Sequence, residues 1–542
     1  MVYVTGSRFL VRLFLRPNGI RGDRVVVYGA GNAGAQLAAS VAGRGDFTVV
    51  AFVDDNPALY GAVINGIEVH APGALPSMIK EFGVSRVLLA LPSASRRRRQ
   101  EIISHLETLP VHVQTMPDVS DLIAGNARVD DIRDVDIADL LGRDTVPPVA
   151  KLLGACVSGK SVMVTGAGGS IGSELCVQIV QLKPRRLVLL EVSESALYTI
   201  DRALRNLVQR NGLATEIVPL LGSVHHQRRM REALLSYEVE TVYHAAAYKH
   251  VPLVEHNMVE GVHNNVFGTL HTAEAAIEAQ VKHFVLVSTD KAVLPTNVMG
   301  ATKRCAELVL QALNERSART TFSMVRFGNV LASSGSVVPL FREQIRNGGP
   351  VTVTHPEIYR YFMTIPEAAA LVIQAGSMAR GGDVFVLDMG EPVRIRDLAE
   401  TMIHLMGLTV KDKDRPDGDI EIKYTGLRPA EKLYEELLIG TNVTGTEHPG
   451  IMRAEEDYIR WPELEPLLEQ LWNACQQFDC AAARALLLRI VAGYKPTAEV
   501  VDLVWRQRAS LAARDRNAGS GGTITALGAR RVNPQAPEQP RI

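Results

Sequence analysis

Residues 160–172 read KSVMVTGAGGSIG, and this stretch decides the fold. The short apolar run at 162–165 has the length and β-branched content of a buried strand. The glycines that follow are spaced GxxGxxG, at Gly166, Gly169 and Gly172. Such glycines allow a tight turn and let the backbone approach a phosphate at the start of the next helix, near Ser170. The stretch therefore predicts a strand, a turn and a helix that bind a dinucleotide.

The segments after this turn continue the same pattern. A second strand is expected at 186–190 and is followed by Glu191, which can accept hydrogen bonds from both hydroxyls of a ribose and repels a 2′-phosphate. No arginine follows directly, so the sequence favours NAD over NADP. Further strands are expected at 217–221 and 241–244, and small residues after the latter let the sheet edge pass close beneath a cofactor. This order predicts an α/β Rossmann fold.

The residues expected to bind the cofactor come from these turns and from one helix. Asn265, in the helix after the fourth strand, is suitably placed to pin the next strand. The predicted set is Gly166, Gly169, Ser170, Ile171, Gly172, Glu191, Ser223, Ala245, Ala246, Ala247 and Asn265.

The stretch at 284–307, FVLVSTDKAVLPTNVMGATKRCAE, supplies the candidate chemistry. Its apolar start predicts a buried strand, and Thr289, Asp290 and Lys291 follow at the carboxyl end, where ligands bind in open α/β sheets. A helix carrying Lys303 is expected to begin near Gly300. A hydroxyl, an acid and a base that emerge together can move protons, so redox or electrophilic power must come from a neighbouring group.

Composition excludes several other classes of protein. The chain has 542 residues, a net charge of −1, 46% hydrophobic and 22% charged residues, which is ordinary for a globular protein of two or three domains. Nothing in it suggests a nucleic-acid partner. The five cysteines form no CxxC pair and are predicted to be reduced core thiols in the cytosol, so neither a disulfide frame nor a metal site is expected.

The N-terminus, residues 1–20, carries a basic amphipathic segment, SRFLVRLFLRP at 7–17. No run of about 18 apolar residues exists, so no helix is expected to span a bilayer. The segment is compatible with peripheral contact to an anionic membrane, which implies a cytoplasmic protein at the inner face of the cell membrane. The alternative is a helix packed on the domain behind it, and the sequence leaves both open.

A first Rossmann-like domain is predicted at 21–140. A strand at 25–28 leads into GAGNAG at 29–34, which matches GxGxxG, and a second strand ends at Asp54 and Asp55, where a ribose-binding acid is expected. Such domains also serve as structural or regulatory modules. We interpret it as a nucleotide-binding or architectural domain rather than a second active site, and the arginine run at 96–99 as a solvated helix face.

The remaining boundaries follow from composition. Residues 141–157, which contain Pro147 and Pro148, are interpreted as a linker, and 158–510 as the catalytic domain with a substrate-binding part. Residues 511–542 contain the Gly-, Pro- and Arg-rich end of the chain and are predicted to be a disordered tail.

Six motifs in order resemble the extended short-chain dehydrogenase/reductases, more narrowly the UDP-N-acetylglucosamine 4,6-dehydratases of the bacterial polysaccharide-biosynthesis branch. They are TGAGGSIG, HAAAYKHVPLVE, STDKAVLPTNVMGATK, RFGNVLASSGSVVPLF, RYFMTIPEA and GLRPAEKLYEELL. The resemblance covers residues 8–505. Larger members usually carry transmembrane helices ahead of the first domain, and residues 7–17 correspond to their juxtamembrane segment.

The resemblance implies a bound NAD that is used twice. Hydride leaves carbon 4 of the sugar, the ketone acidifies the proton on carbon 5, water is eliminated across carbons 5 and 6, and hydride returns to carbon 6. By similarity, Thr289 hydrogen-bonds the carbon 4 hydroxyl, Asp290 protonates the departing hydroxyl, and Lys291 takes the carbon 5 proton.

Met299 departs from the superfamily pattern. Most relatives have Tyr-x-x-x-Lys, in which the phenol takes the hydroxyl proton and the lysine holds the ribose, whereas this chain has Met299 and Lys303 at that spacing. A thioether has no proton to exchange. One interpretation is an inactive site; the other, which the dehydratase branch favours because it shares the methionine, is that Thr289 and its neighbours carry the proton while Lys303 keeps its ribose contact.

The resemblance also indicates residues that bind the UDP-sugar. They are Lys249, Asn329, Ser336, Arg360, Arg428 and Lys432. Arginines offer bidentate geometry to a diphosphate. Glu431 and Glu435 can accept hydrogen bonds from ribose or uracil, although a surface helix carboxylate is the more ordinary interpretation of Glu435. The family usually has glycine where Ala430 stands. A homo-oligomer is expected.

Two rival functions remain open. A sugar-nucleotide 4-epimerase of the same superfamily keeps Tyr-x-x-x-Lys and needs no Asp-Lys pair. A non-catalytic regulator that binds NAD or another nucleotide is suggested by the doubled Rossmann pattern. The mass of the product from UDP-N-acetylglucosamine distinguishes the three.

Overall fold

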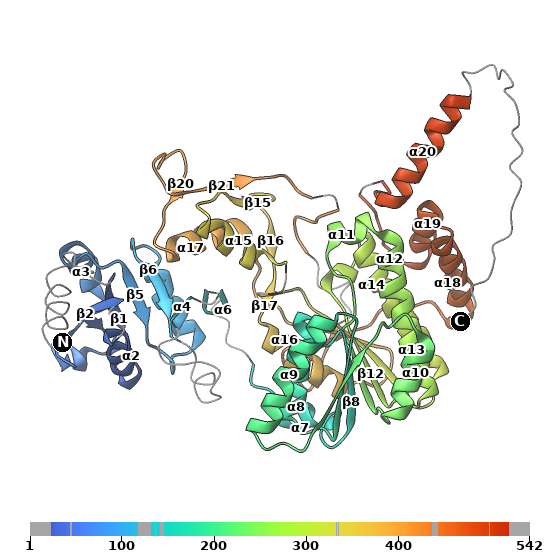
Figure 1. Ribbon diagram of the computed structural model, residues 1–542, viewed down its shortest axis with the longest axis horizontal. Helices are drawn as coiled ribbons and strands as arrows, with labels where there is room; N and C mark the ends of the chain where they lie inside the picture. Colours follow the sequence, from blue (N-terminus) through green and yellow to red (C-terminus); the bar gives the residue numbers. More distant parts are fainter. Residues whose placement is uncertain are drawn as a thin grey trace, which may run out of the picture.

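A computed structural model of the chain has two Rossmann-like domains, a smaller lobe between them and a C-terminal helical region (Figure 1). It describes residues 23–43, 46–116, 132–135, 137–140, 146–331, 333, 335–428, 430–435, 443–497 and 499–519, with only the backbone of 512–519. The basic segment at 7–17 lies outside the described residues.

The first domain is built on a parallel sheet with one antiparallel strand at each edge. Its order in the described residues is β3-β4-β2-β1-β5-β6-β7. The strands are β1 Asp23–Tyr28, β2 Phe47–Val53, β3 Val63–Ile64, β4 Ile67–His70, β5 Arg86–Leu89, β6 His112–Thr115 and β7 Arg133–Asp134. The helices are α2 Asn32–Ala42, α3 Leu75–Phe82, α4 Arg96–Leu106 and α6 Ile137–Leu140, with short turns η1 Pro57–Leu59 and η2 Pro72–Ala74.

The second sheet confirms the predicted α/β Rossmann fold. Its order is β10-β9-β8-β11-β12-β13-β18-β23-β22, parallel from β10 to β18, and only β23 and β22 are antiparallel additions among the described residues. The strands are β8 Ser161–Thr165, β9 Arg186–Glu191, β10 Glu216–Leu221, β11 Thr241–His244, β12 His283–Val287, β13 Thr321–Arg326, β18 Asp383–Leu387, β22 Val443–Gly445 and β23 Ile451–Ala454. The strand order reverses between β8 and β11, so the crevice for a ligand lies above them.

Helices cover both faces of this sheet, as the continuous apolar runs of its strands require. One face packs on α7 Ala150–Ala155, α8 Ser170–Gln181, α9 Glu194–Arg210 and α16 Ile365–Ser377. The other packs on α10 Gln227–Ser236, α11 Val251–His256, α12 Met258–Val262, the π-helical turn η3 His263–Phe267, α13 Gly268–Glu278 and α14 Val298–Arg316.

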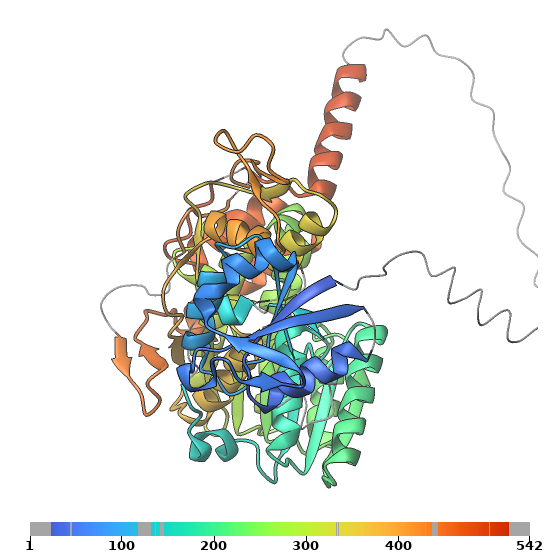
Figure 2. The same cartoon turned by 90° about the vertical axis from the view of Figure 1, so that its left-hand side faces the viewer.

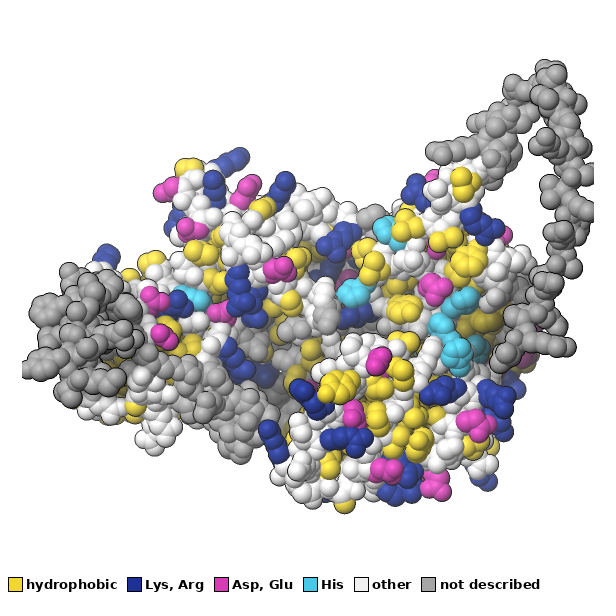
Figure 3. All heavy atoms as spheres, in the orientation of Figure 1, with side chains coloured by type: hydrophobic (Ala, Val, Ile, Leu, Met, Phe, Trp, Pro, Cys, Tyr) yellow, Lys and Arg dark blue, Asp and Glu magenta, His cyan; other side chains and the backbone are white. Residues whose placement is uncertain are grey.

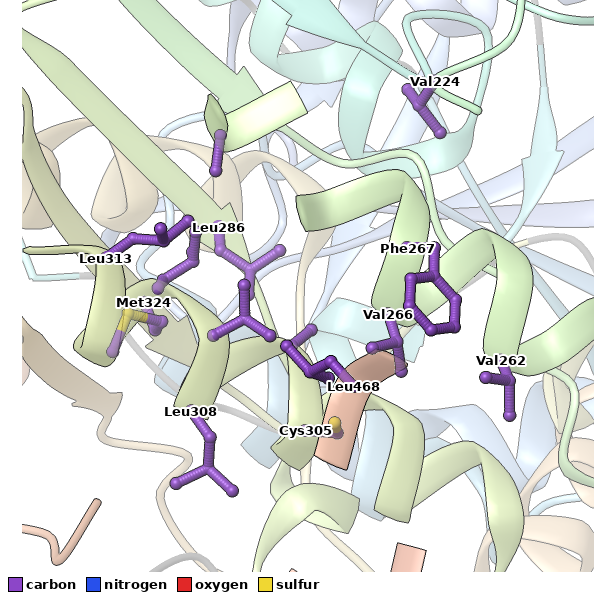
Figure 4. Close-up of a cluster of buried hydrophobic side chains, with 14 of the residues drawn as sticks. Val224, Val262, Val266, Phe267, Leu286, Cys305, Leu308, Leu313, Met324 and Leu468 are labelled. Atoms are coloured by element: carbon purple, nitrogen blue, oxygen red, sulfur yellow. The ribbon is translucent and has the colours of Figure 1, made fainter. Parts of the chain in front are cut away.

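Helix α14 is the central helix of the second face. Its residues from Val298 to Leu313 are all buried. Figure 4 shows Cys305 and Leu308 of α14 in the same cluster as Leu286 of β12 and Leu468 of α18 Trp461–Gln476. Helix α14 is therefore held between the sheet and the C-terminal helices, which fixes the side chains at its start.

A smaller lobe lies over the carboxyl edge of the catalytic sheet. Its elements are β14 Asn329–Val330, α15 Val337–Arg346, β15 Val351–Val353, β16 Tyr359–Arg360, β17 Phe362–Met363, β19 Val393–Arg394, α17 Ile395–Leu405, β20 Val410–Lys411 and β21 Ile420–Tyr424. The first domain contacts this lobe at two points. Arg346 of α15 forms an ion pair with Asp134 of β7 at 2.9 Å, and the backbone of His112 in β6 forms an isolated antiparallel β-bridge with Met406, just after α17. The two units are thus joined at β6, β7, α15 and α17.

The predicted linker and tail are both partly wrong. Within 141–157, α7 packs against the catalytic domain, and Leu152 and Cys156 are buried because the apolar stretch covers the sheet. Helix α20 Leu503–Gly519 continues nine residues into the predicted tail, and Figure 2 shows it projecting from the body. Residues 520–542 lie outside the described residues.

The C-terminal hairpin of α18 and α19 Cys480–Ile490 packs on α14. Trp472 of α18 contacts the rings of His263 and His271 at centroid distances of 5.1 and 5.9 Å. Figure 3 shows histidines gathered on one part of the molecular surface. The five cysteines are buried and free, as predicted. Of the helices that the structure describes, none is long and apolar enough to cross a bilayer.

Candidate active site

A cavity of about 910 Å³ opens where the carboxyl ends of the catalytic strands meet the smaller lobe. The glycine turn before α8 forms one end, and the turn after β12 forms the floor. The segments after β11 and β13 and the segment from Arg428 to Glu435 form the walls. The cavity therefore joins the predicted cofactor loop to the candidate proton-transfer residues.

The glycine turn is as tight as its sequence predicts. Gly166 has φ +66°, and a Cβ on Gly172 would lie 2.0 Å from the carbonyl oxygen of Gly166. Helix α8 begins at Ser170, and Gly169, Ser170, Ile171 and Gly172 line the cavity, so the N-terminus of the helix faces it. The carboxylate of Glu191 accepts hydrogen bonds from the backbone N–H of Gly168 at 2.9 Å and of Ser193 at 3.0 Å. Glu191 thus ties the end of β9 to the turn.

The predicted cofactor residues divide into two groups. Those that line the cavity are Gly169, Ser170, Ile171, Gly172, Ala245, Ala247 and Lys303. Those that do not line it are Gly166, Glu191, Ser223, Ala246 and Asn265. The prediction that Asn265 pins the next strand is wrong. Its amide bonds the backbone N–H and C=O of Tyr248 and the hydroxyl of Thr302, so it fixes the loop after β11 instead.

The turn after β12 forms a connected acid–base pair. The hydroxyl of Thr289 donates to Oδ1 of Asp290 at 2.8 Å, and Nζ of Lys291 donates to the same oxygen at 3.1 Å. Asp290 is 1% exposed, and its Oδ2 has no hydrogen-bond partner although it is buried. Thr289 and Lys291 line the cavity, whereas Asp290 does not.

Lys291 faces three acceptors. Besides Asp290, they are Oδ1 of Asn329 at 3.3 Å and a carboxylate oxygen of Glu435 at 3.4 Å. Burial lowers the pKa of Lys291, but the charges of Asp290 and Glu435 outweigh it, so the pKa is raised above its usual value. The resting site therefore holds a charged lysine between two carboxylates.

Met299 and Lys303 occupy the first two turns of α14. Met299 is 2% exposed and lines the cavity at the position where the superfamily has its phenol. Nζ of Lys303 donates to the carbonyl oxygen of Val287 at 2.7 Å, and burial lowers its pKa to about 8. Lys303 therefore ties α14 to the end of β12, directly below the Thr289 turn.

A buried charge network supports this turn, and sequence reasoning missed it. Ser288 donates to Glu307 at 2.6 Å, and Glu307 pairs with Arg326 at 2.5 Å and Arg304 at 3.1 Å. Both arginines also pair with Glu456. Glu307 and Arg326 are fully buried. The network joins β12, α14, β13 and the segment after β23.

The predicted substrate residues all line the cavity: Lys249, Asn329, Ser336, Arg360, Arg428 and Lys432. Ser336 occupies the N-cap position of α15, but its side chain makes no capping hydrogen bond, and its buried hydroxyl has no partner among the described residues. Arg360 is 8% exposed and is already engaged by Glu431 and by backbone carbonyls. Burial lowers the pKa of Lys249.

Glu435 is not the surface helix carboxylate that the sequence suggested. Its side chain is 5% exposed and lies between Lys291 and Arg360, in an irregular segment. The one signal for this role in the sequence was that Glu435 lies in a motif rich in charged residues, GLRPAEKLYEELL. Its contacts with Lys291 and Arg360 join residues that are distant in sequence. Among the described residues, no cluster of His, Cys, Asp or Glu is arranged to hold a metal ion.

In the first domain, Asp54 accepts hydrogen bonds from the backbone N–H of Ala30 at 2.7 Å and of Asn56 at 2.8 Å. Its carboxylate therefore fixes the glycine turn from within. The arginine run is not simply solvated, because Arg98 pairs with Asp55 at 3.0 Å and Arg99 lies 3.3 Å from Asp139. These ion pairs tie α4 to the rest of the domain.

Comparison with known proteins identifies the family of the chain. A family described as polysaccharide biosynthesis proteins matches residues 162–456, which is more than half of the chain. The chain belongs to this family. The matched residues include the glycine turn, the Thr289 turn and Glu435, so these parts of the cavity lie inside one family domain.

Relatives within the polysaccharide biosynthesis family extend the match to the first domain. The capsular polysaccharide biosynthesis protein CapD of Staphylococcus aureus is 41% identical over 481 residues, which is 87% of this chain and 79% of that protein. The probable polysaccharide biosynthesis protein EpsC of Bacillus subtilis is 40% identical over 86% of this chain and 79% of its own length. A UDP-glucose 4-epimerase of Rickettsia canadensis is 32% identical over 56% of this chain and 83% of its own.

Proposed function

We propose that the protein is an NAD-dependent 4,6-dehydratase of a UDP-N-acetylhexosamine, most simply UDP-N-acetylglucosamine, in polysaccharide biosynthesis. The observation that carries this proposal is the Asp290–Lys291 pair, hydrogen-bonded at 3.1 Å, in which Lys291 lines a cavity that reaches the glycine turn and Asp290 lies buried beside it. Elimination of water needs one group that gives a proton and one that takes a proton, and the pair supplies both.

The residues at the glycine turn fit NAD. The tight turn that Gly166 and Gly172 allow and the start of α8 suit a diphosphate, and Glu191 at the end of β9 suits a ribose without a 2′-phosphate. When bound, NAD supplies the reversible hydride acceptor that makes the sugar a 4-ketone. Lys303 is the residue of α14 that would hold it.

The chain's own groups account for the proton balance of the elimination. In the productive form Asp290 is protonated and Lys291 is neutral. Lys291 takes the carbon 5 proton, Asp290 gives its proton to the carbon 6 hydroxyl, and one water leaves. A proton then passes from Nζ of Lys291 to Asp290 across their hydrogen bond, which restores the starting pair.

We propose that the diphosphate of the UDP-sugar binds near the start of α15. Ser336 offers a buried hydroxyl without a partner, α15 offers free N–H groups, and Lys249 offers a cation. Arg428 and Lys432 line the facing wall. Because Arg360 is already engaged, we propose that it shapes this wall rather than clamps the phosphate.

A 4-epimerase is the second candidate, because an epimerase is among the relatives. Met299 at the phenol position and the Asp290–Lys291 pair argue against it. Incubation of the purified protein with UDP-N-acetylglucosamine separates the candidates by mass spectrometry. Loss of one water indicates the dehydratase, an unchanged mass with a new sugar indicates the epimerase, and no turnover supports a nucleotide-binding regulator.

The proposal predicts the cofactor that the protein retains. Glu191 and the absence of a following arginine favour NAD, so protein denatured after purification should release NAD. Chromatography of the supernatant measures this. A supernatant that contains mainly NADP would refute the assignment.

We further propose a cytoplasmic location at the inner face of the membrane, where residues 7–17 bind anionic lipid. Replacing Arg8, Arg12 and Arg16 with glutamate should then abolish co-sedimentation with anionic vesicles. Unchanged co-sedimentation would count against membrane contact through this segment. We also propose a homo-oligomer, and light scattering of the purified protein measures its size.

A further inference from the structure

Glu435 is a buried carboxylate at the centre of the proposed proton-transfer site. Its Oε1 lies 3.4 Å from Nζ of Lys291 and 3.6 Å from Nε of Arg360, and its side chain is 5% exposed. Burying a carboxylate is costly unless cations compensate it. Here the compensating cations are the proposed base and the arginine of the facing wall.

The contacts of Lys291 define what Glu435 contributes. Nζ of Lys291 donates hydrogen bonds to Asp290 and Asn329 and forms an ion pair with Glu435. Asn329 is neutral, and Asp290 belongs to the same turn and moves with it. Glu435 is the charged acceptor that approaches Lys291 from another segment, where Arg360 anchors it.

We propose that Glu435 is a positioning residue for Lys291. Its carboxylate holds Nζ in place and keeps the shared proton on the Asp290–Lys291 pair up to alkaline pH. This inference rests on the proposed function, because it assigns a role in the elimination. The side chain of Glu435 binds the ammonium that forms when Lys291 takes the carbon 5 proton.

The charges around Lys291 give the sign of the expected effect. Burial lowers the pKa of Lys291, Asp290 from its own turn and Glu435 from the facing segment raise it, and Arg360 from β16 lowers it. Removing the charge of Glu435 therefore lowers the pKa of this amine. An opposite charge at this distance is worth about 1–3 pKa units, and we expect about 1 because Asp290 remains.

The first test needs no turnover. Lys291 is labelled with trace acetic anhydride at pH 9 and its peptide is quantified by mass spectrometry. Only the neutral amine reacts, so Glu435→Gln should raise the labelling rate about tenfold, which corresponds to about 1 pKa unit. Glu435→Asp should give a smaller rise. An unchanged or lower rate in Glu435→Gln would overturn the inference.

Glu431→Gln is the matched control. Glu431 lies on the same segment and pairs with the same arginine at 3.2 Å, but no contact joins it to Lys291. We expect its Lys291 labelling rate to match the wild type, whatever it does to substrate binding. A tenfold rise in this variant as well would show that the segment as a whole, rather than Glu435, sets the state of the lysine.

The second test separates this inference from the proposed function. The elimination needs the one shared proton, so activity should fall at alkaline pH when that proton is lost. Glu435→Gln should move this alkaline limb of kcat about 1 pH unit lower. If the wild type removes no water from UDP-N-acetylglucosamine, the proposed function fails and the labelling result still decides the inference. If the wild type is active and the limb does not move, the inference fails alone.

Discussion

Lys291→Ala and Asp290→Asn should each reduce turnover of UDP-N-acetylglucosamine at least about 100-fold and up to about 10,000-fold, the usual contribution of general acid–base catalysis. Lys291→Ala removes the group proposed to take the carbon 5 proton. Asp290→Asn keeps the shape but removes the proton that the departing hydroxyl needs. Mass-spectrometric rates of water loss, at saturating substrate, measure the effect.

Met299→Leu is the control on the same cavity. Met299 is buried and lines the cavity, but a thioether exchanges no proton. A swap that conserves volume costs the fold less than about 1.5 kcal/mol, so the protein should stay folded. The rate should fall far less than in Lys291→Ala, because no proton donor or acceptor is removed. A loss as large as that of Lys291→Ala would show that the division of roles at this site is wrong.

The fold was predictable where local pattern and tertiary structure agree. The apolar runs before Gly166, Glu191 and Ser288 became β8, β9 and β12, because a strand buried on both faces has a continuous apolar sequence. Reasoning from the local sequence pattern failed at residues 150–155. Pro147 and Pro148 before a short apolar segment indicated a linker, whereas packing against α16 makes it α7.

The candidate site was predictable in part, because its motifs are local and its charge pairs are not. Thr289, Asp290 and Lys291 are consecutive, so the strand end brings them together. Glu435 and Lys291 are distant in sequence, and nothing local shows that they meet. Glu307 was likewise invisible, because a carboxylate in a helix is ordinarily a surface group.

Glu307→Ala should destabilise the catalytic domain by about 3–5 kcal/mol, the usual cost of breaking a buried ion pair by removing one partner. The carboxylate is fully buried against Arg326 and Arg304, so its loss leaves two buried guanidiniums that share Glu456 as their remaining carboxylate partner among the described residues. Urea unfolding followed by tryptophan fluorescence measures the change. Glu315→Ala, on the exposed end of the same helix, should change stability by less than about 0.5 kcal/mol.

The acid dependence of stability tests the same network independently. Burial raises the pKa of Glu307, but Arg326 and Arg304 outweigh it and lower the pKa to about 2. The folded-state pKa is depressed, so the stabilisation is present above the unfolded value of about 4.3 and is lost as pH falls toward 2. Wild-type protein should therefore lose stability across this window more steeply than Glu307→Gln, which has no proton to gain there. If the free energy of unfolding of the two proteins depended on pH in the same way, Glu307 would not be ionised in the folded state. Its support of Ser288 and the Thr289 turn would then be a neutral hydrogen bond.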